Sequence, residues 1–373
     1  MDEGIRGRSG FLLGADRPDV LRALARLSEK DYGAPPSGAL PIRITSSYEA
    51  GCWSDLAIQL DSDHLQNGNQ VIQSGRSCVS ELLKGSRGNR RQVAVFRGQD
   101  YAVRFQAAAE RQGFVSPSCD LIMQAVWSMA QMLGHVITEQ AGQSLYFCTS
   151  LYEQEAPAFQ VGQGLFCFTV TAMVVTPNDQ VPLTVWINRP AKSQAIDFSW
   201  RDRDSKRNYF CGVRGKRAEQ FPVRLNVDPD GHVLDLSYMN FFAVIDDVLH
   251  TPCASGPLFP GIVRHSIMRL ARSMGVEVVE AQLDVEALTD AIREGRVTEA
   301  FATGMAGDIL PIKSLREEGG REYRVGHETG TLTQVLRTML LDIQEGRLDD
   351  VYEWMDTRSP HEQPFRAVRK SKW

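Results

Sequence analysis

Segments with the two-residue period of a β-strand alternate along this chain with segments of helical period. Apolar residues recur at helical spacing over Cys119–Leu133, and strand-like apolar runs follow at Leu165–Val175 and Leu183–Ile187. A helix is predicted over Ile262–Met274, because a Pro-Gly pair precedes this segment and a glycine follows it. Short strands interleaved with amphipathic helices bury their apolar faces as sheets with helices packed on them, so the predicted fold class is α/β (α+β).

A tight turn is predicted at Asp228-Pro-Asp-Gly231, because this tetrad combines residues that favour a hairpin. It separates the strand-like segments Val223–Val227 and Val233–Leu236, which gives a strand-turn-strand unit. The remaining predicted elements are helices over Asp19–Lys30, Asp284–Glu294 and Leu332–Glu345, strands over Gln92–Phe96, Leu145–Ser150, Phe241–Ile245 and Val276–Val279, and a link rich in proline and glycine over Gly33–Pro41.

The length of the chain bears on its domain organisation. At 373 residues it exceeds the usual size of one core, so one large domain or two medium ones are expected. Thr176-Pro-Asn-Asp-Gln180 carries a turn signal between two strand-like segments, and we place a domain boundary there. The predicted organisation is an N-terminal domain over 1–175, an interdomain loop over 176–182 and a C-terminal domain over 183–373.

Charge and cysteine content argue against several classes of protein. A net charge of −5 is the opposite of the concentrated basic face that nucleic-acid binding requires. Met1–Arg8 carries charges where a signal peptide has an apolar run, and no apolar stretch reaches the roughly 18–20 residues of a membrane span. We therefore expect a cytoplasmic protein with no membrane partner. The seven cysteines are scattered without a CxxC pair, so neither disulfides nor a metal site is expected.

Several blocks in the C-terminal half resemble motifs of one enzyme family, and they occur in the family's order. These blocks are Met239–Val244, Thr251–Gly256, Leu258–Ile267, Glu299–Gly304, Gly330–Gln334 and Ile343–Arg347. They resemble the branched-chain aminotransferases, which belong to the fold-type-IV group of pyridoxal phosphate (PLP) enzymes. In the N-terminal half, Phe96–Arg104 resembles a further motif, whereas Ser74–Lys84 keeps only the glycine of the family's "YGQ..FEG".

This resemblance implies a fold and an assembly. The family's fold has a smaller N-terminal and a larger C-terminal α/β domain, with the cofactor in a cleft between them. It also implies a homodimer that completes each site. The chemistry of the family requires a lysine for PLP, a carboxylate at the pyridine nitrogen and a phosphate site.

The lysine is missing from the position where the resemblance implies it. Asn208-Tyr209 is similar to the "NY" of the family's lysine motif, and counting back from it puts Asp204, or Arg203 after a one-residue gap, at the lysine position. Lys206 lies two residues beyond Asp204, a displacement of about 6.5 Å along a strand. The run Trp200–Arg207 also holds six charges where the family has glycines. We therefore predict that no residue here binds PLP covalently.

The resemblance implies a phosphate site and ring contacts with several substitutions. Gly261-Ile262-Val263 opens a helix whose N–H groups and dipole attract an anion, and Arg104 matches the family's phosphate-binding arginine. Val263 and Met305 replace two threonines of the family, and Met305 follows the retained Thr303-Gly304. Around the ring, Tyr209 matches the tyrosine at the ring oxygen, Asp235 replaces the glutamate at the pyridine nitrogen, and Tyr238 replaces a small residue.

These substitutions lead to three hypotheses. The first, which we favour at this stage, is an enzyme that uses no cofactor and performs isomerisation, cyclisation or elimination on a small anionic or polar substrate. The side chains available for acid–base chemistry are Asp204, Lys206, Tyr209, Asp235 and His250. The second is a PLP-dependent aminotransferase of hydrophobic amino acids that uses Lys206 and passes the amino group to 2-oxoglutarate. The third is a non-catalytic subunit that binds a ligand or an active relative.

Overall fold

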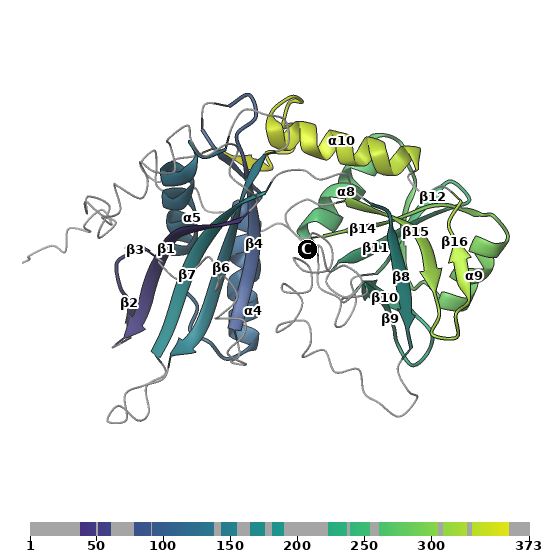
Figure 1. The fold of residues 1–373 in the computed structure, drawn as a ribbon, viewed down its shortest axis with the longest axis horizontal. Helices are drawn as coiled ribbons and strands as arrows, with labels where there is room; N and C mark the ends of the chain where they lie inside the picture. Colours follow the sequence, from purple (N-terminus) through teal and green to yellow (C-terminus); the bar gives the residue numbers. More distant parts are fainter. Residues whose placement is uncertain are drawn as a thin grey trace, which may run out of the picture. The chain divides into compact units, whose positions relative to one another are not determined.

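The structure is a computed structural model, and it describes most of the predicted elements (Figure 1). The described residues are 38–49, 51–60, 78–90, 92–137, 143–154, 165–175, 181–189, 223–236, 239–253, 261–304, 309–326 and 330–357. The predicted helix Asp19–Lys30 and the predicted turn Thr176–Gln180 lie outside them. The chain forms two compact units. Of the described residues, the first unit contains those up to Val175 and Asp350–Thr357, and the second contains Val181–Asp349.

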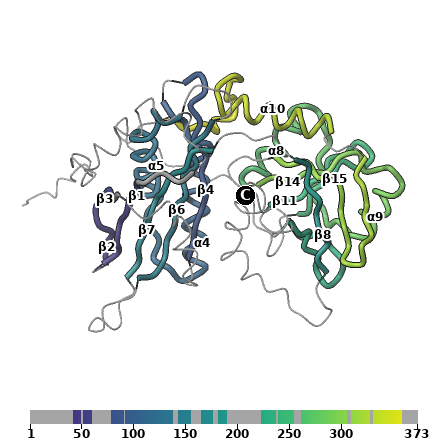
Figure 2. The backbone as a smooth tube through the Cα atoms, in the orientation of Figure 1, coloured from purple at the N-terminus to yellow at the C-terminus, as the bar shows by residue number. Residues whose placement is uncertain are grey.

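The first unit is built on an eight-stranded sheet. Its strands are β1 (Gly38–Glu49), β2 (Cys52–Trp53), β3 (Ala57–Leu60), β4 (Cys78–Ser86), β5 (Ala94–Phe96), β6 (Ser144–Gln154), β7 (Leu165–Val175) and β17 (Met355–Asp356). Their order is β17-β5-β4-β6-β7-β1-β2, with β3 paired to β1. Figure 2 shows β1 (purple) running beside β7, and the two strands pair antiparallel from Gly38 opposite Val174 to Tyr48 opposite Phe166.

Two helices, α4 (Gly98–Arg111) and α5 (Cys119–Leu133), pack on this sheet. α5 has the predicted bounds, because its apolar residues recur at helical spacing and Ser118 caps its first turn by accepting the Leu121 N–H at 3.1 Å. The ring of Phe105 in α4 lies edge-on to Phe168 of β7 at 5.7 Å between centroids. The apolar stripes of the helices and one face of the sheet therefore form a shared core.

The second unit is built on a nine-stranded sheet of mixed direction. Its strands are β8 (Leu183–Asn188), β9 (Arg224–Val227), β10 (Val233–Leu236), β11 (Asn240–Ile245), β12 (Val248–Pro252), β13 (Val278–Ala281), β14 (Val297–Thr303), β15 (Ile309–Arg316) and β16 (Glu322–Arg324). Their order is β10-β9-β8-β15-β14-β11-β12-β13, with β16 paired to β15. The helices are α8 (Ile262–Ser273), α9 (Val285–Arg293) and α10 (Thr331–Glu345).

The hairpin between β9 and β10 forms as its turn residues predict. The Asp228 carboxylate accepts the backbone N–H groups of Asp230 at 3.0 Å and His232 at 2.8 Å. Gly231 has φ +95°, a conformation that favours glycine. Nearby, Asp284 caps α9 by accepting the Ala287 N–H at 2.8 Å.

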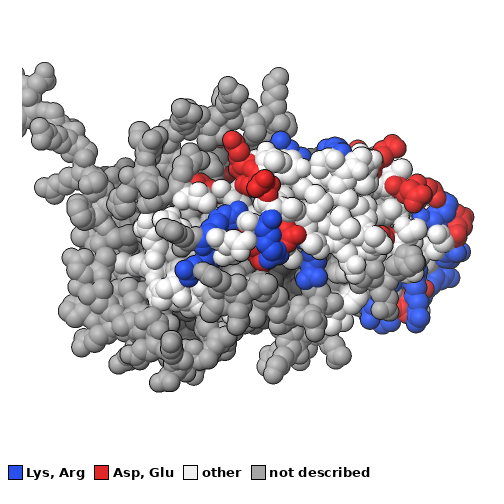
Figure 3. Space-filling model, turned by 90° about the horizontal axis from the view of Figure 1, so that it is seen from above, with Lys and Arg blue, Asp and Glu red and all other residues white. Residues whose placement is uncertain are grey.

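Exposed charges gather at the end of the second unit that carries α9 and β16, where Figure 3 shows basic and acidic side chains intermingled. Arg293 pairs with Asp290, and Arg296 pairs with Glu294 at 2.8 Å and with Asp246 at 3.2 Å. Exposed pairs of this kind contribute little to stability because solvent screens them, so the stability of the unit comes from its core. Among the helices of the described residues, none is both long enough and apolar enough to cross a bilayer.

Several predicted boundaries differ from the structure, and three of the differences have a clear physical cause. The residues after Asp350 group with the first unit instead of a C-terminal domain over 183–373, because β17 pairs with β5 and the Arg97 N–H donates to the Trp354 carbonyl at 2.6 Å. The link predicted to reach Pro41 ends earlier, since β1 begins at Gly38. The strand predicted at Val276 begins at Val278, because the Val276 N–H is bonded to the Ala271 carbonyl at the end of α8.

Candidate active site

The N-terminus of α8 is one part of the candidate site. Gly261 is the N-cap residue, no side chain among the described residues caps the helix, and its first turn holds no acidic residue. A helix start carries a partial positive charge from the helix dipole. It therefore favours a negatively charged group, as the sequence predicts for Gly261–Val263. The side chains of Ile262 and Val263 are buried, so the backbone is what this turn can offer to an anion.

Thr303 lies beside this helix start. Thr303 and Asn240 are directly opposite each other on β14 and β11. Asn240 lies against the helix, because a Cβ added to Gly261 would fall 1.9 Å from the Asn240 Oδ1. The Thr303 hydroxyl is buried and has no hydrogen-bond partner among the described residues. An unsatisfied buried hydroxyl costs about 1–3 kcal/mol, so a phosphate oxygen that accepts from it would remove a penalty that the fold carries.

Arg264 fixes α8 to the strand that precedes it. Its guanidinium is almost fully buried and donates to the Pro252 carbonyl at 2.7 Å, to Glu280 at 3.0 Å and to the Thr251 hydroxyl at 3.2 Å. Burial lowers the pKa of Arg264, and the Glu280 carboxylate opposes this shift. This arginine, which belongs to the Leu258–Ile267 block, is therefore required by the fold, because it sets the position of the helix start.

Glu299 fixes the first turn of α10 in the same way. This buried carboxylate accepts the N–H of Leu332 at 2.9 Å, the N–H of Thr333 at 2.8 Å and the Thr333 hydroxyl at 2.7 Å. A Cβ at Gly330 would fall 1.8 Å from the Glu299 Cδ, so only glycine fits there. Glu299 begins the block that ends at Thr303 and Gly304, and its contacts tie this strand to α10.

Asp235 lies on β10, opposite Asn226 of β9. The carboxylate is buried, and its Oδ1 accepts a hydrogen bond from the Asn226 Nδ2 at 3.1 Å. Asp235 therefore lies within the strand and is buried there. A buried carboxylate that is already oriented by a neighbour is suited to meet a protonated ring nitrogen, as the resemblance implies.

Arg104 belongs to the first unit, where it is paired with an acidic residue. Its Nε and one Nη donate to the two carboxylate oxygens of Glu81, at 2.9 and 2.6 Å. Burial disfavours its charge, but Glu81 and the Tyr101 side chain outweigh this effect and raise the pKa of Arg104. The predicted phosphate-binding arginine thus has an acidic partner within its own unit, which the sequence did not reveal.

The structure describes only part of the predicted site. It brings Gly261, Ile262, Val263, Thr303 and Gly304 together around the start of α8 and places Asp235 in the same unit. Asp204, Lys206, Tyr209 and Met305 lie outside the described residues, and so does Tyr238.

Sequence reasoning missed the asparagine opposite Asp235. The turn alone did not reveal it, because a regular hairpin that pairs Val227 with Val233 would place Asn226 opposite Leu234. A register shift between Val233 and Asp235 brings Asp235 opposite Asn226 instead. Sequence reasoning also did not consider the turn as a metal site. Among the described residues, Asp228, Asp230 and His232 bring possible ligand atoms within 4.8 Å of one another. Because the Asp228 carboxylate already accepts two backbone N–H groups, these contacts are explained by the turn itself.

With this geometry described, the chain can be compared with known proteins. The family model described as amino-transferase class IV matches residues 216–315. A probable branched-chain-amino-acid aminotransferase of Streptomyces coelicolor is 28% identical over 297 residues, which is 75% of this chain and 80% of the relative. One from Staphylococcus epidermidis is 37% identical over 158 residues, covering 39% of this chain and 44% of the relative.

A solved structure agrees with these relatives on the fold. The branched-chain amino acid aminotransferase of Thermobaculum terrenum in its PLP form is 18% identical, with a TM-score of 0.61, over 84% of this chain and 97% of that chain. The chain is therefore similar in sequence to branched-chain aminotransferases, and it shares the fold of the solved one.

These relatives contradict the prediction that no cofactor is used. They are aminotransferases, and the similar structure from T. terrenum is described in its PLP form. The prediction gave too much weight to the missing lysine and threonines and too little to the retained helix start and Thr303. The cofactor to which the comparisons point is PLP.

Proposed function

We propose that this protein is a PLP-dependent aminotransferase that transfers the amino group of a hydrophobic amino acid to 2-oxoglutarate. The observation that supports this most strongly is the buried Thr303 hydroxyl beside the α8 start. It has no partner among the described residues, in a chain that is similar to branched-chain aminotransferases. A homodimer and a cytoplasmic location belong to the same proposal. They rest on the resemblance and on the sequence.

The phosphate and the pyridine ring of PLP would be held by different elements of the second unit. The backbone at Gly261–Val263 and the Thr303 hydroxyl would bind the phosphate, with Gly304 next to it. Because Val263 and Met305 replace two threonines of the family, the site offers two hydroxyls fewer to the phosphate than the family's site does. The Asp235 carboxylate would accept a hydrogen bond from the ring nitrogen and keep it protonated.

PLP, when bound, supplies an electrophilic carbon and a ring that withdraws electrons from the substrate. We propose Lys206 as the amine that holds PLP and moves a proton during the transfer. Tyr209 would lie at the ring oxygen, and Asp204 would lie two residues before the amine, on the same side of an extended strand. The role of Tyr209 follows from the resemblance, whereas Lys206 is chosen as the lysine nearest to the position that the resemblance implies.

The experiment adds PLP to the purified protein and records the visible spectrum. We expect an absorbance band at longer wavelength than that of the free coenzyme. We also expect formation of glutamate from leucine and 2-oxoglutarate. Lys206→Ala should lose both, whereas the matched control Lys313→Ala, on β15, should keep both.

Two outcomes contradict parts of this proposal. A protein that gives neither the band nor glutamate, with any amino acid of a hydrophobic panel, is not an aminotransferase of this kind and fits a non-catalytic subunit instead. A protein that keeps the band after Lys206→Ala uses another lysine, and the assignment of Lys206 is then wrong.

A further inference from the structure

A row of three amide and carboxylate side chains crosses the second unit and ends at Asp235. Asn188, Asn226 and Asp235 are direct neighbours on the adjacent strands β8, β9 and β10. The Asn188 Nδ2 donates to the Asn226 Oδ1 at 3.0 Å, and the Asn226 Nδ2 donates to the Asp235 Oδ1 at 3.1 Å. The row is therefore continuous.

This row is not on the face that forms the apolar core. On β9, Leu225 and Val227 belong to the core cluster, and on β8 so do Val185 and Ile187. Because side chains alternate along a strand, Asn226 and Asn188 point to the opposite face. Asn226 and Asp235 are nevertheless only 8% and 7% exposed. Buried amides are costly unless they are bonded, and packing of the core does not explain why this row is present.

Asp235, at the end of the row, fixes the direction of the two hydrogen bonds. An ionised carboxylate only accepts, so Asn226 must present its Nδ2 to Asp235 and its Oδ1 to Asn188. Asn188 must then donate. Each amide is thereby held in one of its two orientations, and the carboxylate plane of Asp235 is restrained through Oδ1.

We propose that Asn226, oriented by Asn188, is a positioning residue that holds the Asp235 carboxylate toward the pyridine nitrogen of PLP. This inference rests on the proposed function and adds two residues to it. An aspartate is one methylene shorter than the glutamate of the family, so the carboxylate reaches less far. A fixed donor on one oxygen compensates by restricting the carboxylate to one orientation, since an oriented group loses less freedom when the ring nitrogen arrives.

The alternative is a purely structural role, in which the row only stabilises the edge of the sheet, where β10 is the last strand. The two interpretations differ in what a substitution does to ligands with and without the ring nitrogen. We would therefore measure the dissociation constant of Asn226→Ala and Asn226→Asp for PLP, and for the PLP analogue in which a C–H group replaces the ring nitrogen. The absorbance maximum of bound PLP is a second readout, because it responds to protonation of the ring.

A matched control lies on the same face of the sheet. Ser314 of β15 donates to the Thr184 hydroxyl of β8 at 3.3 Å, which is also a polar contact between neighbouring strands. Ser314→Ala removes such a contact without touching Asp235. It should reproduce any general loss of stability and leave the affinity for PLP unchanged.

We expect both Asn226 variants to bind PLP about tenfold more weakly and to shift its absorbance maximum, because one hydrogen bond to a charged group is lost. The affinity for the analogue should change by less than about twofold. An equal loss of affinity for both ligands, or no loss for either, would overturn the positioning role while leaving the proposed function intact. A wild-type protein that binds no PLP would overturn both.

Discussion

Replacing Glu299 with glutamine tests whether one buried carboxylate holds α10 on the sheet of the second unit. The two side chains have nearly the same shape, so the substitution removes charge and acceptor capacity but leaves no cavity. The amide oxygen can still accept one backbone N–H, such as that of Leu332. The amide nitrogen would then face the N–H of Thr333, which is a donor, and the Thr333 hydroxyl, which could no longer donate to a carboxylate oxygen.

The magnitude follows from these contacts. Two hydrogen bonds to a charged group are lost, and each is worth about 1.5 kcal/mol at the lower end of the usual range. The favourable interaction of the carboxylate with the positive end of α10 is lost as well, at roughly 0.5 kcal/mol or more. We therefore expect Glu299→Gln to lower the free energy of unfolding by about 3 kcal/mol. This is a large fraction of the roughly 5–15 kcal/mol that stabilises a typical domain.

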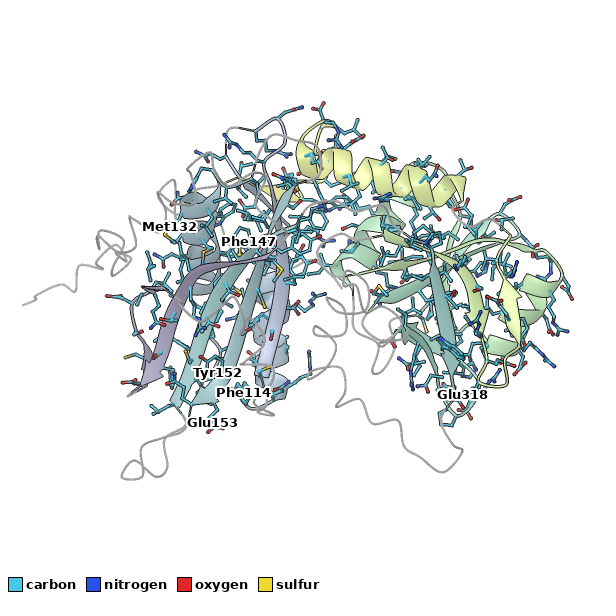
Figure 4. All side chains as sticks on the ribbon, in the orientation of Figure 1. Phe114, Met132, Phe147, Tyr152, Glu153 and Glu318 are labelled. Atoms are coloured by element: carbon cyan, nitrogen blue, oxygen red, sulfur yellow. The ribbon has the colours of Figure 1, made fainter. Side chains whose placement is uncertain are left out.

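The assay is urea unfolding followed by circular dichroism, with Glu318→Gln as the matched control. Glu318 is an exposed glutamate in the turn between β15 and β16, where Figure 4 labels it, so the control makes the same substitution in solvent. The control should unfold within about 0.5 kcal/mol of the wild type. If Glu299→Gln is as stable as Glu318→Gln, the reasoning that α10 depends on this carboxylate is refuted.

Three further predictions concern the same unit. Gly330→Ala should destabilise the protein by at least about 2 kcal/mol in the same urea assay, because its Cβ cannot avoid Glu299. Arg264→Lys should lower the melting temperature by several degrees, since a lysine cannot reproduce the fork that reaches both Pro252 and Glu280. The pKa of Glu280 lies below its ordinary value of 4.5 despite burial, because Arg264 and Arg272 bind its charged form. The contribution of the Glu280 carboxylate to stability is complete above pH 4.5 and is lost as the pH falls through the lowered pKa. Glu280→Gln should therefore flatten the decline in melting temperature below pH 4.5.

The sequence by itself determined the elements whose signals are local. α5 and β7 have the predicted bounds, because helical spacing and a continuous apolar run are properties of neighbouring residues. The β9–β10 hairpin was predictable in the same way, since Asp228 and Gly231 supply the turn within the segment itself.

The comparisons point to the same family as the resemblance, and it was the missing lysine that led to the wrong prediction about the cofactor. Motif spacing locates the start of α8 and Thr303. It does not show how much affinity for the cofactor is lost when other residues of the site are replaced. Lys206 stays a prediction, since it lies outside the described residues.

Only the tertiary structure decided which residues far apart in the chain meet. The pairing of β17 with β5 returns the segment after Asp350 to the first unit, and no local pattern in either strand specifies that partner. The roles of Glu299, Arg264 and Asn226 were equally ambiguous, because the sequence does not show whether a charged or amide side chain is solvated or buried. Burial raises the cost of an unmade hydrogen bond, so their roles follow from the partners that the fold brings to them.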